Sequence, residues 1–123
     1  MLLALKYTHS KNIMHRDIKP ANILIHFPDV VIDPSLDPLQ NLDLDTPNEH
    51  LDLFNAEFKL ADFNISTESK TGFQQTVSGT PFFSSPEILA KRTYSYQNDI
   101  WSLGVSIYHL AALKLPFKGK SNK

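Results

Sequence analysis

Apolar residues occur in short clusters along this chain, and polar loops separate the clusters. The stretch 1–9 places its apolar residues at helical spacing and predicts the end of a helix that stops at the polar sequence HSKN. Short apolar runs at 13–14, 23–25 and 58–61 flank polar loops and predict small strands, although periodicity alone does not separate a short strand from a buried helical segment. We therefore expect a mixture of helices and short strands.

Two further helices are predicted in the second half of the chain. Pro86 suits the first position of a short helix from 85 to about 91, because the missing N–H of proline has no intrahelical partner there in any case. The stretch 98–113 is apolar almost all round, which predicts a helix buried at the centre of the fold. Trp101 lies on that helix, and we expect its large apolar side chain in the core.

The stretch from about 27 to 57 differs from the rest of the chain in composition. It holds eight acidic residues, no lysine or arginine, and four of the eight prolines. It shows no sustained helical or strand period, so we expect an exposed insertion into the surrounding domain. The remaining residues then carry a net charge of about +7, which suits a groove for anions, although a solvated surface of mixed charge explains the same count.

Overall composition narrows the class of protein. A chain of 123 residues is one domain of modest size, and 12 basic against 13 acidic residues indicate neither a nucleic-acid nor a membrane partner. The absence of cysteine excludes a disulfide framework and a thiolate site. The first residues do not resemble a secretory leader, and the apolar run 100–113 is shorter than the roughly 20 residues that a bilayer requires. We expect a soluble intracellular protein, cytoplasmic in the first instance, with nuclear or cytoskeletal association left open.

The sequence HRDIKPAN, residues 15–22, gathers groups that suit phosphoryl transfer. Asp17 and Asn22 lie five residues apart in one loop, where a carboxylate can orient a hydroxyl and an amide oxygen can bind Mg²⁺. Lys19 can neutralise charge on a phosphoryl group, and Asp62 can bring a second carboxylate from another loop. Taken singly, each has a plain structural explanation as a loop cap, a turn former or a solvated charge.

The order of the motifs resembles that of the eukaryotic protein kinases, whose catalytic loop reads H-R-D-x-K-P-x-N and whose metal-binding loop begins D-F-G. The sequences HRDIKPANIL, KLADFN, SGTPFFSSPEIL and YQNDIWSLGVSIYHLAALKLPF follow one another in the order of that family. The resemblance implies an α+β protein-kinase-like fold, here a partial C-terminal (large) lobe over 1–123 that is mainly helical with short strands, with the small lobe absent. GTPFFSSPE and the stretch ending in LKLPF are most similar to the NIMA-related kinases.

The resemblance also implies a role for each matching residue. Asp17 would be the catalytic base, Lys19 the phosphate-facing cation of the serine/threonine class, and Asn22 and Asp62 the Mg²⁺ ligands. Thr80 would face the protein substrate and contact the catalytic loop. ATP and Mg²⁺ are the implied cofactors and a protein is the implied substrate, whereas the oligomeric state stays open.

Five other positions have roles implied by the same resemblance. Arg16 would meet a phosphate on the segment 62–87, with Thr76 as the expected regulatory site. An unmodified polar loop is the alternative explanation of that segment. Asp99 would accept N–H groups from the catalytic loop, and Phe63 would stack with His15.

The chain departs from the kinase pattern in two respects. Asn64 stands where the family has glycine, and we expect it to slow or bias the metal loop without removing metal binding, because asparagine tolerates a left-handed backbone. No glycine-rich phosphate cover is present in the chain. Three hypotheses remain: a serine/threonine kinase that is inactive as this isolated chain, a pseudokinase-type binding module, and a non-functional truncated remnant.

Overall fold

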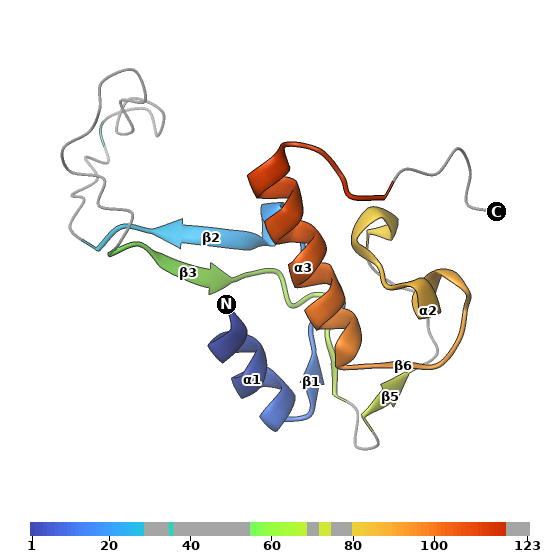
Figure 1. Ribbon diagram of the computed structural model, residues 1–123. Helices are drawn as coiled ribbons and strands as arrows, with labels where there is room; N and C mark the ends of the chain where they lie inside the picture. The colour runs from blue at the N-terminus through green and yellow to red at the C-terminus, as the bar shows by residue number, and fades with distance from the viewer. Residues whose placement is uncertain (29–34, 36–54, 69–71, 75–79, 118–123) are drawn as a thin grey trace. The chain divides into compact units, whose positions relative to one another are not determined.

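The computed structural model describes residues 1–28, 35, 55–68, 72–74 and 80–117 (Figure 1). The chain divides into two compact units, one made of Met1–Leu24 with Leu60–Lys123 and the other of Ile25–Lys59. The larger unit contains every described residue of the predicted catalytic loop and of the segment from 62 to 87. Each unit is therefore described by itself.

Short strands and helices alternate along the described residues, as the apolar pattern predicts. In chain order the elements are α1 (Leu2–Ser10), β1 (Ile13–Met14), the short turn η1 (Pro20–Asn22), β2 (Ile23–His26), β3 (Glu57–Leu60), β4 (Thr67–Glu68), β5 (Phe73–Gln74), the turn η2 (Pro81–Phe83), α2 (Pro86–Leu89), β6 (Tyr94–Ser95) and α3 (Gln97–Ala112). The predicted helix over 1–9 and the strands at 13–14, 23–25 and 58–61 are confirmed within a residue or two.

Strand pairing joins segments that lie far apart in the sequence. Within the described residues the strands form two-stranded sheets, β1 with β4, β2 with β3 and β5 with β6. The first and last pairs are antiparallel, with Met14 opposite Thr67 and Gln74 opposite Tyr94. Both of these pairs attach the segment that follows Asp62 to other parts of the larger unit.

The smaller unit contains most of the predicted insertion. Its described residues include the end of β2 and the beginning of β3, two strands that pair with each other. Ile25 and Phe58 are exposed there, and Lys59 forms an exposed ion pair with Glu57 at 3.1 Å. Most of the stretch 27–57 lies outside the described residues, so the insertion stays a prediction. Among the described residues no helix is both long and apolar enough to cross a membrane.

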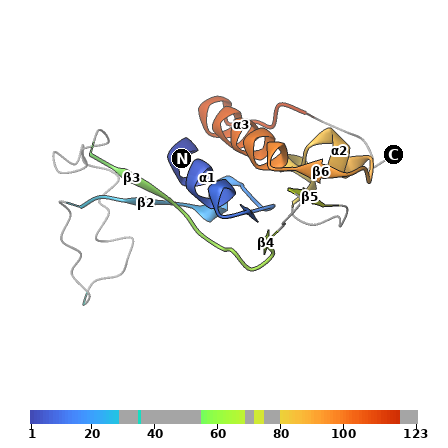
Figure 2. The ribbon, with the colours of Figure 1, turned by 90° about the horizontal axis from the view of Figure 1, so that it is seen from below.

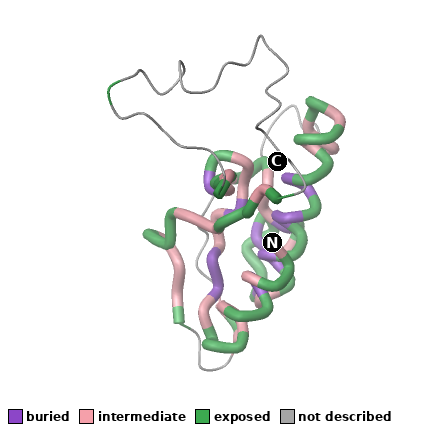
Figure 3. The backbone as a smooth tube through the Cα atoms, turned by 90° about the vertical axis from the view of Figure 1, so that its left-hand side faces the viewer, coloured by how far each residue is buried: buried purple, intermediate pink, exposed green. Residues whose placement is uncertain are grey.

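The core of the larger unit is built on α1 and α3. Figure 2 shows α1 beside α3. Leu5 of α1 packs against Leu103 of α3 together with Ile18 from the predicted catalytic loop. A second cluster joins the strands to α2 and consists of Met14, Ile88 and Tyr94. In Figure 3 the buried residues, drawn in purple, occur on helical turns as well as on extended segments. Apolar packing of Ile18 against α1 and α3 therefore holds the predicted catalytic loop in place.

Helix α2 begins as predicted and ends early. Pro86 takes its first position, with Ser85 as the N-cap. The helix stops at Leu89, two residues before the predicted end, and Lys91 has a left-handed φ of 53°. Its N–H then bonds to the carbonyl of Ile88 at 2.9 Å, which closes the helix end.

Helix α3 is buried on one face only, which corrects the prediction of burial all round. Its buried face carries mostly polar side chains, namely Asn98, Asp99, Ser102 and Ser106, beside Leu103 and Val105. Large apolar residues of the same helix, Ile100, Ile107 and Leu110, are exposed. The prediction that Trp101 lies in the core is wrong, because the residue is 37% exposed and its ring stacks on Phe117 with 5.4 Å between centroids.

Exposed residues of α3, together with the buried Val105, contribute to an apolar pocket of about 510 Å³ that is lined by Gln97, Ile100, Trp101, Gly104, Val105, Tyr108, Pro116 and Phe117. None of these residues belongs to the predicted catalytic loop or to the segment from 62 to 87. The residues predicted to carry the chemistry therefore do not line this pocket.

Candidate active site

The loop that carries the HRD sequence is held by a buried carboxylate. Asp99 is 1% exposed, and its two oxygens accept the backbone N–H groups of His15 at 2.9 Å and Arg16 at 2.8 Å. The same carboxylate lies 2.8 Å from Nε2 of His9 on α1. Arg16 has a left-handed φ of 71°, a conformation that costs free energy in a non-glycine residue and persists where the surroundings impose it. These contacts agree with the scaffold role predicted for Asp99.

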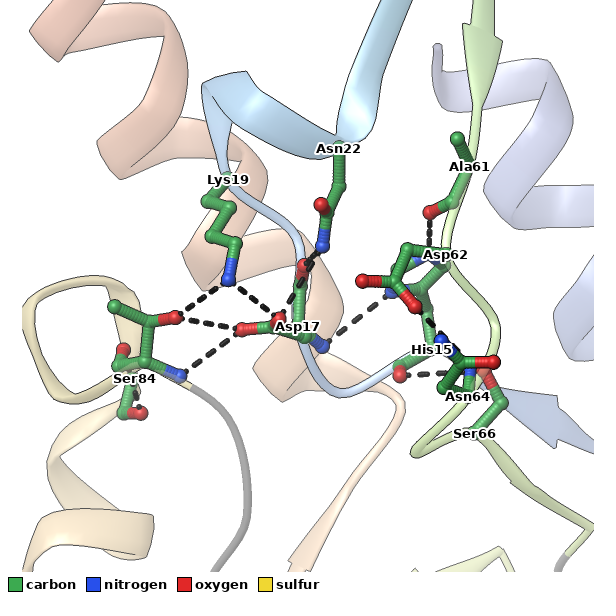
Figure 4. Close-up of polar contacts among 10 residues, drawn as sticks. His15, Asp17, Lys19, Asn22, Ala61, Asp62, Asn64, Ser66 and Ser84 are labelled. Atoms are coloured by element: carbon green, nitrogen blue, oxygen red, sulfur yellow. Dashed lines mark hydrogen bonds and ion pairs between the residues drawn. The ribbon is translucent and has the colours of Figure 1, made fainter.

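Asp17 lies at the centre of a converging set of hydrogen-bond donors. Its Oδ1 accepts the backbone N–H of Thr80 at 3.0 Å and the Thr80 hydroxyl at 2.8 Å. Its Oδ2 accepts from Lys19 Nζ at 2.7 Å and from the Asn22 side-chain amide at 3.2 Å. Figure 4 shows Lys19 and Asn22 both turned toward Asp17. The sequence places these four residues up to 63 positions apart, and the fold brings them together.

Thr80 is joined to the loop by its hydroxyl as well as by its backbone. The hydroxyl donates to Asp17 and accepts from Lys19 Nζ at 3.0 Å. Asn22 adds a second bond from its amide nitrogen to the backbone carbonyl of Asp17 at 2.8 Å, which fixes the loop on itself. The contact predicted between Thr80 and the acidic and basic residues of the loop is therefore present.

These contacts keep Asp17 ionised. Burial alone would raise the pKa of its carboxyl, but hydrogen bonds from Lys19 and Thr80 and the positive charge of Lys19 outweigh burial and lower the pKa below its ordinary value of 3.8. A carboxylate with a lowered pKa is a weak proton acceptor. Its main contribution to chemistry is then to orient a hydroxyl and to stabilise positive charge beside it.

The lowered pKa of Asp17 predicts how stability depends on pH. Since the folded-state pKa lies below the unfolded one, the stabilisation from its contacts is complete above the unfolded value and is lost as pH falls through the folded value. The difference in free energy of unfolding between wild type and Asp17→Asn should therefore be constant from neutral pH to about 5 and shrink below about 4. Urea denaturation at a series of pH values measures it. A difference that shrinks already between pH 7 and 5 would contradict the lowered pKa.

The second loop, 61–66, packs beside the first. The ring of His15 bonds through Nε2 to the carbonyl of Ala61 at 2.9 Å and meets the ring of Phe63 edge-on, with 4.6 Å between centroids. The predicted stacking of these two side chains is thus observed. Figure 4 shows Asp62 and Asn64 beside His15, and the backbone N–H of Asn64 donates to Asp62 Oδ1 at 3.4 Å.

The left-handed residue of this loop is Asp62, with a φ of 62°, and Asn64 has no positive φ. Our expectation linked Asn64 to a left-handed backbone, and the structure corrects it. The turn that directs the carboxylate is made at the aspartate itself, where aspartate tolerates this conformation better than most residues. The exchange of glycine for asparagine therefore creates no forbidden backbone geometry in this conformation.

The residues predicted to bind Mg²⁺ offer oxygen ligands from two loops. Asn22 uses its amide nitrogen in both bonds to Asp17, so the amide oxygen, the atom that a hard cation prefers, is not involved in these bonds. Asp62 is exposed and supplies a carboxylate. The described residues contain no group of three or more histidine, cysteine, aspartate or glutamate side chains suited to a metal. Two protein ligands nevertheless fit Mg²⁺, which usually completes its shell with water and substrate phosphates.

Arg16 is bound to the segment after Asp62. Its Nε donates to the carbonyl of Ile65 at 2.7 Å, and Nη1 donates to the hydroxyl of Tyr94 at 3.4 Å. Thr76, the predicted phosphate-bearing partner, lies outside the described residues, so that pairing stays a prediction.

The buried hydroxyl of Ser85 has no hydrogen-bond partner among the described residues. Replacing it by alanine removes a desolvated polar group, so we expect Ser85→Ala to raise the free energy of unfolding by up to about 1 kcal/mol. Ser84→Ala is the control, because the Ser84 hydroxyl donates to the carbonyl of Thr80 at 3.2 Å and its loss should lower stability. Urea denaturation measures both changes, and a Ser85→Ala variant less stable than Ser84→Ala would contradict this prediction.

Sequence reasoning missed the buried polar residues that support the site. His9 received no role, yet it bonds to Asp99. Asn98 and Ser102 were read as part of an apolar helix, yet both bond to the segment after Thr80. The available signal was the recurrence of polar residues at 98, 99, 102 and 106, which is helical spacing for a single face.

Comparison with known families supports the resemblance that the sequence motifs indicated. The model of the protein kinase domain matches residues 1–123. The chain belongs to the protein kinase domain family. The recognition from the motifs is thereby confirmed, and the α+β architecture with helices and short strands agrees with it.

Several curated relatives are similar over nearly the whole chain. The protein named "Probable serine/threonine-protein kinase nek1" of Dictyostelium discoideum is 39% identical over 98% of this chain, and serine/threonine-protein kinase nekl-2 of Caenorhabditis elegans is 37% identical over 98%. An Aurora kinase of Yarrowia lipolytica is 34% identical over 94%. The chain spans 23%, 27% and 24% of the lengths of these relatives. NIMA-related kinases are thus among the relatives, as the motifs predict.

Proposed function

We propose that this chain is the part of a serine/threonine protein kinase that positions the protein substrate for transfer of the ATP γ-phosphoryl group to a hydroxyl. The convergence of Lys19, Asn22 and Thr80 on the carboxylate of Asp17 carries the proposal. The kinase family and its serine/threonine members among the relatives support the reaction class. The assignment of the chain to the large lobe, and of activity to a longer protein, belongs to the same proposal.

Each residue of the site has a defined task in this reaction. Asp17 mainly orients the substrate hydroxyl and, as a weak base, receives its proton as the phosphoryl group is transferred, and Lys19 balances charge on the oxygens around it. Asn22 and Asp62 hold Mg²⁺ through oxygen atoms. When bound, Mg-ATP supplies the phosphoryl group and the metal neutralises its developing charge. Thr80 keeps the segment that faces the substrate against the base.

The structure of Asp17 indicates how a substrate would enter. Described residues donate four hydrogen bonds to its oxygens, and a carboxylate has about four acceptor positions. A substrate hydroxyl must therefore share or replace one of these donors. The Thr80 hydroxyl is the natural donor to yield, because the Thr80 N–H stays bound to Asp17 and the hydroxyl oxygen still accepts from Lys19.

Two other hypotheses remain. A pseudokinase-type binding module is favoured by Asn64 in place of the usual glycine of the metal loop. A truncated remnant without function is the third. The complete set of Asp17, Lys19, Asn22 and Asp62 favours the enzyme, since a scaffold has no chemical requirement for all four. We extend the proposal to an intracellular location, where ATP is abundant.

Nucleotide binding separates the enzyme from the binding module. In the longest natural protein that contains this chain, we expect ATP binding by isothermal titration to depend on Mg²⁺. Asp62→Ala should weaken binding of Mg-ATP at least about tenfold, whereas Glu68→Ala, an exposed carboxylate outside the site, should not change it. ATP affinity that is the same with and without Mg²⁺, in wild type and in Asp62→Ala, would favour the binding module.

A further inference from the structure

We propose that Asn64, which stands where the kinase pattern has glycine, supplies a third protein oxygen to the Mg²⁺ site of Asn22 and Asp62. The inference rests on the proposed kinase function and gives a chemical role to the residue by which this chain departs from the family. Glycine has no side chain, so the usual pattern offers no ligand at this position. The departure at residue 64 is then an added ligand and not the loss of one.

The two loops that carry the predicted metal ligands are joined through their backbones. The N–H of Ala61 donates to the carbonyl of Asn22 at 2.9 Å, and the carbonyl of Ala61 lies 2.9 Å from His15 Nε2. Asn22 is 6% exposed, and its amide nitrogen bonds to Asp17, which fixes that side chain. Because Asp62 follows Ala61 directly, the second loop begins beside a ligand whose place is set.

Asn64 lies next to the carboxylate of Asp62. Its backbone N–H donates to Asp62 Oδ1 at 3.4 Å (Figure 4). Phe63, between the two, places its ring against His15, whereas Asp62 and Asn64 are both exposed. Among the described residues, Asp62 Oδ2 accepts no hydrogen bond and the Asn64 side-chain amide makes none. The oxygen atoms of both side chains are therefore available to a cation.

An aspartate and an asparagine two positions apart suit a hard cation. In the calcium-binding loop D-x-[DN]-x-[DN]-G, the side chains at the first and third positions bind the same ion. The run Asp62-Phe63-Asn64 has that spacing. The rest of the calcium pattern is missing, because Thr67 replaces its glycine and the Ser66 hydroxyl donates to the carbonyl of His15 at 3.3 Å. The spacing thus supports one added ligand and no separate calcium site.

The charge of the site explains why a further oxygen matters. Asp62 is the only carboxylate in the predicted ligand set, and Asn22 is neutral. Asp17 is paired with Lys19 at 2.7 Å, so its charge is already balanced. The affinity of a site for a hard cation depends on the number and charge of its oxygen ligands. An amide oxygen that takes the place of one water molecule therefore raises the affinity without changing the net charge.

Binding of Mn²⁺ alone tests the ligand without any need for catalysis. Mn²⁺ prefers the same oxygen ligands as Mg²⁺, and electron paramagnetic resonance measures the free ion. In the longest natural protein that contains the chain, Asn64→Gly and Asn64→Ala should both weaken Mn²⁺ binding by about tenfold, the lower end of the effects of supporting groups at metal sites. Asn64→Asp, which keeps an oxygen and adds a charge, should bind at least as tightly as wild type.

The alanine variant separates a ligand from a backbone effect. Glycine at residue 64 removes the amide and also frees the backbone, whereas alanine removes the amide and leaves the backbone restricted. If backbone freedom alone set the affinity, Asn64→Gly would differ from wild type and Asn64→Ala would not. That result would overturn the inference.

A change of metal preference tests direct contact with the ion. The chain has no cysteine of its own, and thiolates select soft metals. Asn64→Cys should therefore weaken Mn²⁺ binding and create Cd²⁺ binding with a thiolate-to-metal charge-transfer band, seen as a difference from wild type. Glu68→Cys, at an exposed position of β4, is the matched control. Adding Asp62→Ala should weaken Cd²⁺ binding by Asn64→Cys and leave that of Glu68→Cys unchanged.

The outcomes distinguish this inference from the proposed function. If Mn²⁺ binding depends on the Asn64 amide but wild type transfers no phosphate, the ligand stands and the proposed function fails. Equal Mn²⁺ binding by wild type, Asn64→Gly and Asn64→Ala overturns the inference whether or not phosphate is transferred. Cd²⁺ binding by Asn64→Cys that is no tighter than by Glu68→Cys, or that does not depend on Asp62, overturns it as well.

Discussion

Asp17→Asn is expected to lower kcat for phosphoryl transfer to a protein substrate by about 10²- to 10⁴-fold, the usual range for a general base and its orienting contacts. The amide has nearly the shape of the carboxylate but lacks its charge. It also cannot accept the bonds of Lys19, Asn22 and Thr80 at both oxygens, because one of its two ends is a donor. Lys19 would then keep its positive charge without its carboxylate partner.

The measurement is steady-state transfer by the longest natural protein that contains the chain, with Mg-ATP at saturation. Glu68→Gln makes the same carboxylate-to-amide change at an exposed position of β4 and should leave kcat unaltered. Thermal unfolding of the variants establishes that both are folded under the assay conditions. An Asp17→Asn variant that stays folded and retains kcat within about threefold of wild type would remove Asp17 from the chemistry.

Asp99→Asn is expected to lower the free energy of unfolding by about 2–4 kcal/mol, the largest stability effect that we predict. The carboxylate accepts from His15 N, Arg16 N and His9 Nε2. An amide at this position turns its NH₂ group toward at least one of these donors. The donor is then buried without a partner, and the hydrogen bonding that stabilises the left-handed backbone of Arg16 is weakened.

Glu57→Gln provides the contrast for Asp99→Asn. Glu57 also pairs with a basic side chain, Lys59, but both side chains are more than half exposed, and such pairs contribute about 0–1 kcal/mol. Urea denaturation with comparison of the m-values measures both variants. If Asp99→Asn costs no more than Glu57→Gln at an unchanged m-value, Asp99 is not the support of the catalytic loop.

The sequence was sufficient to predict the helices, three of the described strands and the central contacts of the site. Short apolar runs predicted β1, β2 and β3 because β-branched and aromatic residues favour strands, although β2 and β3 are mostly exposed. The contacts of Asp17 with Lys19 and Thr80 followed from the order of the motifs, which the kinase resemblance ties to a known arrangement. Distances and the direction of each bond required the structure.

The burial of α3 could not be predicted from the same pattern. Apolar residues on most of its surface indicated a helix surrounded by core, yet the buried face is the polar one. A hydrophobicity pattern assigns buried positions to apolar side chains, and it has no means to recognise serine, asparagine and aspartate that are buried because they bond to loops distant in sequence. Trp101 was misplaced for this reason.

Backbone conformation was the second property that the sequence did not predict. Arg16 and Asp62 adopt left-handed φ angles that their own preferences do not predict. Asp99 imposes the first through its bond to the Arg16 N–H, a contact across 83 residues. The departure at Asn64 linked a left-handed backbone to the wrong residue, because the sequence identifies an unusual residue and does not show which neighbour makes the turn.

The most direct test of the central proposal is transfer of the γ-phosphoryl group from Mg-ATP to a protein substrate by the longest natural protein that contains this chain, followed by phosphoamino-acid analysis. We predict phosphoserine or phosphothreonine, formed only with Mg²⁺ and lost in Asp17→Asn. A folded wild-type protein that forms neither, or transfer that persists undiminished in Asp17→Asn, would contradict the assignment of Asp17 and its four hydrogen bonds as the centre of a phosphotransfer site.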